Sequence, residues 1–192
     1  MSIVLDIGQG AGLASATGVR PFLPPLLAGA LARGDIGLDF DGTGWQFLES
    51  PGFLAAVLAL AVIAYLAERS GVDRRRLVIA TTVVAAVLGG LLFAGSLAEG
   101  DGPPVAGLVA GVACAVLAAL AVGGVFERAA KRLDDSAAGL LLVYADIAAL
   151  VLAAIAIFVP PVAFLAVIAF AVLLIRGSGG GDEKYAGLRI LR

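Results

Sequence analysis

Long apolar runs are the feature that most constrains this chain. The runs over residues 77–98 and 104–126 contain no charged residue, and each reaches the length of about 20 helical residues that crosses the hydrocarbon core of a bilayer. Hydrophobic residues make up 61% of the 192 positions and charged residues 15%, against about 45–50% and about 25% in soluble domains. The sequence therefore predicts an all-α integral membrane protein.

Charged residues and prolines divide the chain into six apolar segments. They cover approximately residues 2–32, 53–67, 77–98, 104–126, 137–159 and 162–175. We expect one transmembrane domain over residues 1–176, a bundle of about six segments, followed by a glycine-rich tail over residues 177–192. Pro160 and Pro161 separate the last two segments and predict a tight turn between helices.

The loops differ in charge, and this predicts an orientation. The connections ERSGVDRRR and ERAAKRLDD and the C-terminal tail are rich in Arg and Lys, whereas RGDIGLDFDGTGWQFLES and AEGDGPP are mainly acidic. Because Lys and Arg favour the cytoplasmic side, six alternating crossings place all the basic regions inside. We expect a multi-pass protein of the cell inner (plasma) membrane with both termini cytoplasmic. The start MSIVLD lacks the basic region of a cleaved signal peptide.

Composition also limits the chemistry. The net charge of -2 favours no nucleic-acid partner. The chain has no histidine and a single cysteine, Cys114, which excludes internal disulfides, a metal site rich in His or thiolate, and a Ser-His catalytic pair. Asp39, Asp41 and Glu49 offer carboxylates in the first acidic loop, but DFDGTG has too few ligands for a calcium loop. We expect a solvated acidic turn, no metal, no cofactor and no enzymatic activity.

The first apolar segment is broken at TGVRPFLPPLL, residues 17–27. As one helix, its roughly 31 residues would measure about 46 Å and exceed a hydrocarbon core of about 30 Å. The segment is therefore either one long broken span or a helical hairpin that enters and returns. Backbone freed by such a break survives only inside protein or beside a water-filled cavity, and interrupted segments mark binding sites in transporters.

The stretch before the break, GQGAGLASATG, is made almost entirely of small residues. It differs from a phosphate-binding glycine loop because Leu13 occupies the third glycine position and no strand precedes it. Gly8 and Gly12, four residues apart, instead predict close helix packing, as do Gly107 and Gly111.

Two charged residues fall inside the predicted spans. Asp146 lies about nine residues into its segment, near mid-bilayer, and Arg20 is the basic residue of comparable depth. Charges at this depth are costly unless paired or hydrated, and they mark functional sites. We expect Arg20 and Asp146 to meet or to face one cavity, either as a binding site or as a structural ion pair. Asp6 is expected to be solvated near the end of its segment, and Glu68 to lie at the interface.

The pattern resembles a family of small bacterial membrane proteins, Domain of Unknown Function 4126. The resemblance rests on GLASATGVRPFLPPLLAGALA, FLESPGFLAAVLALAVIAYLAE and YADIAALVLAAIAIFVPPVAFLAVI, and it covers most of the chain. The family positions correspond here to Gly18, Arg20, Phe22, Pro24, Ser50, Pro51, Glu68, Asp146, Phe158 and Pro160. Pro21 and Pro25 are additional prolines, and Asp146 stands where the family pattern implies Glu. The family implies an architecture and a choice of residues rather than an activity.

The break and the buried charges together predict a small transporter or permease-like carrier. Its predicted substrate-binding residues are Arg20, Asp146, Thr17, Gly18, Phe22, Pro24, Pro25 and Tyr144, with Ser50, Glu68, Phe158 and Pro160 in support. The expected partners are membrane lipids, a small anionic solute or a lipid headgroup, and a second copy or another membrane protein. Two other functions remain open: a membrane scaffold or accessory subunit, and a lipid-handling protein.

Overall fold

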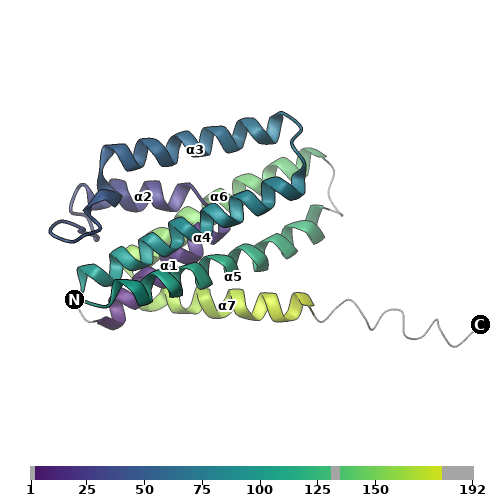
Figure 1. Ribbon diagram of the computed structural model, residues 1–192. Helices are drawn as coiled ribbons and strands as arrows, with labels where there is room; N and C mark the ends of the chain where they lie inside the picture. Colours follow the sequence, from purple (N-terminus) through teal and green to yellow (C-terminus); the bar gives the residue numbers. More distant parts are fainter. Residues whose placement is uncertain (1–2, 131–134, 179–192) are drawn as a thin grey trace, which may run out of the picture.

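The computed structural model describes residues 3–130 and 135–178, and every regular element in these ranges is helical (Figure 1). The α-helices are α1 (Ile3–Val19), α2 (Leu23–Ala32), α3 (Pro51–Arg69), α4 (Arg74–Glu99), α5 (Pro104–Ala130), α6 (Asp135–Phe158) and α7 (Pro160–Ser178), and a short 3-10 helix, η1, covers Gln46–Glu49.

Five of these helices, α3 to α7, are long and apolar enough to cross a membrane. They correspond one by one to the five later segments predicted from the sequence. α6 ends at Phe158 and α7 begins at Pro160, which confirms the turn predicted at the proline pair. The first segment behaves differently, because it forms two shorter helices of 17 and 10 residues. Residues 179–192 of the predicted tail lie outside the described residues.

Helix α1 lies at the centre of the bundle and contacts α4, α5, α6 and α7. Every residue from Gly8 to Gly18 is buried. A Cβ atom at Gly8 would lie 2.7 Å from the Pro160 carbonyl oxygen, and one at Gly18 would lie 2.2 Å from the carbonyl oxygen of Ala115. The small residues therefore bring helix backbones close together, as the sequence predicted for Gly8 and Gly12.

Helices α1 and α2 form a hairpin that we call the α1–α2 hairpin. Near its start, α1 packs against Pro160 through Gly8, and near its end Gly18 packs against Ala115, in the middle of α5. α2 then returns, and Gly29 packs against residues 48 and 54, at the start of α3. The tip of the hairpin therefore lies about halfway along the bundle, while both of its open ends lie at one end.

Prolines determine where the hairpin bends. Pro21 disfavours helical geometry at Arg20, the residue before it, and α1 ends at Val19. Pro24 and Pro25 fall in the first turn of α2, where a backbone N–H has no helical partner and its absence has little cost. The prolines at positions 21, 24 and 25 therefore account for the break between α1 and α2 at residues 20–22.

The hairpin changes the expected arrangement of the termini. The start of α1 lies beside the first residue of α7, whereas Gly177 near the end of α7 lies next to Arg128 at the far end of α5. The described ends of the chain are therefore at opposite ends of the bundle. The first segment turns back within the bundle, and the side of the membrane on which each terminus lies stays a prediction.

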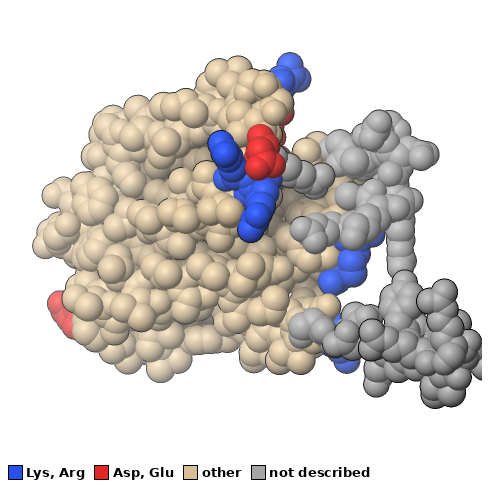
Figure 2. Space-filling model, turned by 45° about the vertical axis from the view of Figure 1, so that its right-hand side comes forward, with Lys and Arg blue, Asp and Glu red and all other residues tan. Residues whose placement is uncertain are grey.

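Within the described residues, the segregation of charge predicted from the loops is present; residues 131–134 of the second basic connection and the tail over residues 179–192 lie outside them. The loops over residues 33–49 and 99–103 lie at the end where the hairpin opens, which we call the acidic end. The connection over residues 69–76, together with Arg128 and Arg176, lies at the other end, which we call the basic end. Figure 2 shows the basic side chains gathered toward one side of the molecule. A cytoplasmic location for the basic end remains a prediction.

Close packing around α1 gives a stability prediction. We expect Gly12→Ala to lower the free energy of unfolding by about 1–3 kcal/mol, because its Cβ would lie 2.5 Å from those of Ala156 and Ala163. Gly123→Ala in α5 is the matched control. A Cβ there meets no atom within 4 Å, and helical Ala is favoured over Gly by about 0.5–1 kcal/mol. Thermal unfolding in detergent measures both, and equal melting temperatures for the two variants would contradict the close packing.

Candidate functional site

Arg20 at the tip of the α1–α2 hairpin forms an ion pair with Asp146 of α6. The Nε atom of Arg20 lies 2.5 Å from Oδ1 of Asp146, and its Nη2 donates a hydrogen bond of 3.2 Å to the Leu142 carbonyl oxygen. The expectation that these two charges meet, 126 positions apart in sequence, is confirmed.

The pair lies at mid-depth and is only partly enclosed. Asp146 stands halfway along the 24 residues of α6, so both charges are far from either end of the bundle. The exposed fractions of the two side chains are 25% for Arg20 and 40% for Asp146. When a carboxylate and a guanidinium pair at this depth, each lowers the free-energy cost of removing the other's charge from water. Their remaining exposed surface leaves the pair accessible to a third group.

An apolar cavity of about 260 Å³ lies next to the ion pair. Val19 and Ala145 line it, and each stands immediately before one member of the pair. The cavity lies between α5 and α6 and also borders α7. Phe126 of α5 and Phe170 of α7 contribute aromatic rings to it. The arrangement thus places a charged pair at one side of an apolar space.

The other predicted binding residues divide into two groups. Thr17 is buried and its hydroxyl donates to the Leu13 carbonyl oxygen at 2.8 Å. Gly18, Pro24 and Pro25 are also buried, in the body of the hairpin. These four residues shape the hairpin. Their predicted contact with a ligand stays untested.

Tyr144 and Phe22 have exposed surface close to the pair. Tyr144 lines the apolar cavity and is 69% exposed. Phe22 is partly buried and directly precedes α2. These two aromatic residues, with Arg20 and Asp146, are the predicted site residues that keep exposed surface near the pair.

The supporting residues predicted from the sequence do not gather around the pair. Ser50 caps α3: its hydroxyl oxygen accepts from the Phe53 N–H at 3.2 Å. Phe158 and Pro160 form the turn between α6 and α7 at the acidic end, and Glu68 is exposed near the basic end. All four residues lie at helix ends or turns, and their predicted support of the site stays a prediction.

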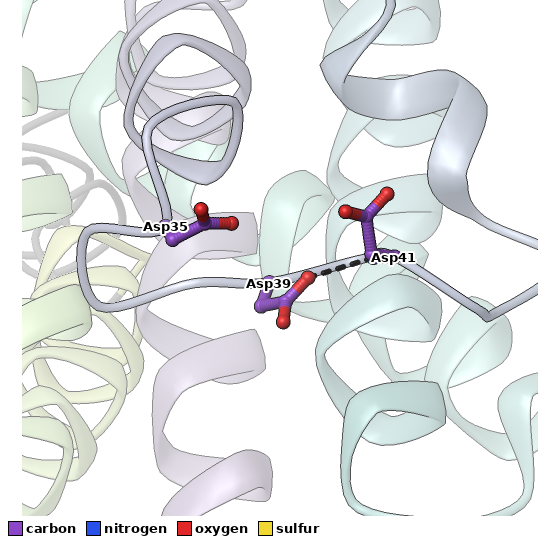
Figure 3. A group of neighbouring side chains, drawn as sticks. All are labelled: Asp35, Asp39 and Asp41. Carbon is purple, nitrogen blue, oxygen red and sulfur yellow. Dashed lines mark hydrogen bonds between the residues drawn. The ribbon is translucent and has the colours of Figure 1, made fainter.

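The first acidic loop gathers three exposed carboxylates (Figure 3). Oxygens of Asp35, Asp39 and Asp41 lie within 4.8 Å of one another, and the Asp41 N–H donates to Asp39 Oδ1 at 2.8 Å. The sequence analysis did not predict Asp35 as part of this group. Its backbone is left-handed, with φ of 54°, and its side chain lies beside the other two carboxylates. Desolvation, followed by the neighbouring Asp41 and Asp39, raises the pKa of Glu49. Three carboxylates fall short of the six to eight oxygens that Ca²⁺ takes.

Sequence reasoning also misplaced Asp6. Its side chain was expected to be solvated, but it is 1% exposed, because α1 enters the centre of the bundle within its first turns. Among the described residues, neither carboxylate oxygen has a hydrogen-bond partner. Gln9, one turn further, donates to the Gly37 carbonyl oxygen at 2.8 Å and accepts from the Ser96 hydroxyl at 2.9 Å. Asp6 and Gln9 are three residues apart, so both side chains lie on one helix face. This spacing was the sequence signal that could have predicted the burial of Asp6.

Five long apolar helices around a short hairpin define a small polytopic α-helical membrane protein. Over residues 7–178 the chain matches the family described as Domain of unknown function (DUF4126), and it belongs to that family. The match includes the hairpin and both members of the ion pair, and it confirms the resemblance seen in the sequence. The comparisons with curated proteins and with solved structures give no match.

The ion pair gives a second prediction, a double-mutant cycle of Arg20→Gln and Asp146→Asn. We expect the two changes to be non-additive, with a coupling energy of about 0.5–3 kcal/mol in unfolding free energy, because each single variant leaves the other charge unpaired at mid-depth. A cycle of Arg128→Gln with Asp146→Asn is the control and is expected to be additive within about 0.5 kcal/mol. Additive effects in the Arg20 cycle would show that the pair contributes nothing to the fold.

Proposed function

We propose that the protein is a small membrane carrier for an anion that has an apolar part. The proposal rests on one observation: the ion pair at mid-depth joins the tip of a hairpin to a spanning helix and keeps exposed surface on both partners. The exposed surface of the two side chains offers room for a third group to approach the pair.

Arg20 supplies the recognition chemistry. Its planar guanidinium presents several N–H donors in a geometry that matches carboxylate and phosphate groups. An incoming anion competes with Asp146 for these donors. The displaced carboxylate then lacks its countercharge, and protonation removes the cost of a bare negative charge at this depth. Anion binding at Arg20 would in this way be linked to proton uptake at Asp146.

The adjacent cavity suggests the rest of the substrate. Its volume of about 260 Å³ and its apolar and aromatic lining fit a hydrocarbon or ring attached to the anionic group. Such a ligand would place its charge at Arg20 and its apolar part beside Tyr144. In this arrangement the carrier lies in the cell inner membrane with its basic end cytoplasmic, its described start on the other side, and lipids around it.

Two alternative functions have support of their own. A lipid-handling role would use the same cavity for an acyl chain and Arg20 for the headgroup. A scaffold role is favoured by α3, in which Val57 is the single buried residue among 19. The remaining surface of α3 is open to a second copy or to another membrane protein.

Anion binding tests the proposed function. We expect hexanoate, used as the probe, to bind purified protein and to lose at least about tenfold in affinity, or about 1.4 kcal/mol, in Arg20→Gln, because the guanidinium holds the carboxylate. Titration calorimetry in detergent measures the binding, and Arg33→Gln in the acidic loop is the control. A neutral alcohol of equal length, hexanol, separates charge recognition from filling of the cavity. Equal hexanoate affinity in the parent and in Arg20→Gln would contradict the proposal.

A further inference from the structure

Polar side chains of α1 and α4 lie at two depths near the acidic end. We call them the outer level, with Asp6 and Glu99, and the inner level, with Gln9 and Ser96. On α1, Asp6 and Gln9 are three residues apart, and on α4 Ser96 and Glu99 have the same spacing, so each pair lies on one helix face. At the inner level, Ser96 donates to Gln9 and Gln9 donates to the Gly37 carbonyl. The inner level is thus fully hydrogen-bonded.

The outer level contains the two acids: Glu99 accepts a hydrogen bond from the Asp39 backbone N–H, whereas the Asp6 carboxylate has no such partner among the described residues. The Asp6 carboxylate lies against Gly100, so closely that a Cβ there would overlap it. Glu99 is the residue before Gly100. In the described part of the chain, both Asp6 oxygens and the Glu99 Oε2 atom are buried without a hydrogen bond. Glycine at position 100 thus leaves the space that the Asp6 carboxylate occupies.

Two carboxylates in these surroundings need a positive charge. A buried carboxylate without a partner is costly by several kcal/mol, and the negative charges of Asp6 and Asp39 both act on Glu99. Within the described residues, Arg20 is the basic side chain that forms an ion pair, and its partner is Asp146. No basic side chain in that part of the protein forms an ion pair with Asp6 or Glu99.

We propose that Asp6 and Glu99 form a binding site for one small cation, either a shared proton or a sodium ion. Both candidates satisfy carboxylate oxygens and cancel one of the two negative charges. The site is separate from Arg20, which stands 14 positions later, directly after the end of α1, about 21 Å further along the helix axis. It does not depend on the proposed anion carrier. In a carrier, it would provide the coupling ion on the helix that ends at the anion site.

Infrared spectroscopy at neutral pH tests the site, because a protonated carboxylic acid has a carbonyl stretch that carboxylates lack. The samples are the full chain in an ester-free detergent, with choline and then with sodium as the buffer cation. A shared proton predicts a carboxylic acid band in choline that is lost in Asp6→Asn and in Glu99→Gln. A sodium site predicts that added sodium raises the melting temperature of the parent and not that of Asp6→Asn.

Asp101→Asn, an exposed acid at the same end, is the control and is expected to behave as the parent does. Glu99→Gln provides the same readouts if Asp6→Asn fails to fold. The proposal is overturned if the parent shows neither a carboxylic acid band that depends on Asp6 or Glu99 nor a sodium-dependent melting temperature. That result would mean that both acids are ionised and that neither holds a proton or a sodium ion.

Discussion

The fold depends on the close packing of one helix made of small residues. Because α1 offers so little side-chain volume between Gly8 and Gly18, four other helices approach its backbone from all sides. A helix buried in this way does not need to reach the far face of the membrane, since its backbone is satisfied within the helix and its surface is covered by protein. A short hairpin can therefore occupy the centre of a bundle of five longer helices.

The same hairpin explains how charges come to lie at the centre of the bundle. Its tip carries Arg20 to the middle of α6, where Asp146 offers the countercharge. Its open end carries Asp6 into the bundle beside Glu99. One helix thus joins a basic group at mid-depth to an acidic group near the acidic end. Any movement of the hairpin would act on both groups, and this is the physical basis for linking the proposed anion site to the proposed cation site.

Much of this arrangement was available in the sequence, because apolar length, proline positions and buried charges are local signals. They predicted the five later helices, the turn at Pro160 and the meeting of Arg20 with Asp146. The signals could not choose between a long broken span and a returning hairpin, since that choice depends on which surfaces α1 covers. Counting six crossings predicted both termini on one face, whereas the described ends of the chain lie at opposite ends of the bundle. Asp6 was misplaced for the same reason: distance from a chain end is a poor measure of burial when the first helix is central.

The path of the first segment is the central claim, and the sidedness of three positions tests it most directly. Single cysteines at Val4, Gly44 and Gly177, placed in a Cys114→Ala background, are labelled with a membrane-impermeant maleimide in intact cells and in inverted vesicles. A returning hairpin predicts that the cysteine at position 4 is labelled from the same side as that at position 44, and that at position 177 from the opposite side. Labelling of positions 4 and 177 from one side would contradict the fold described here.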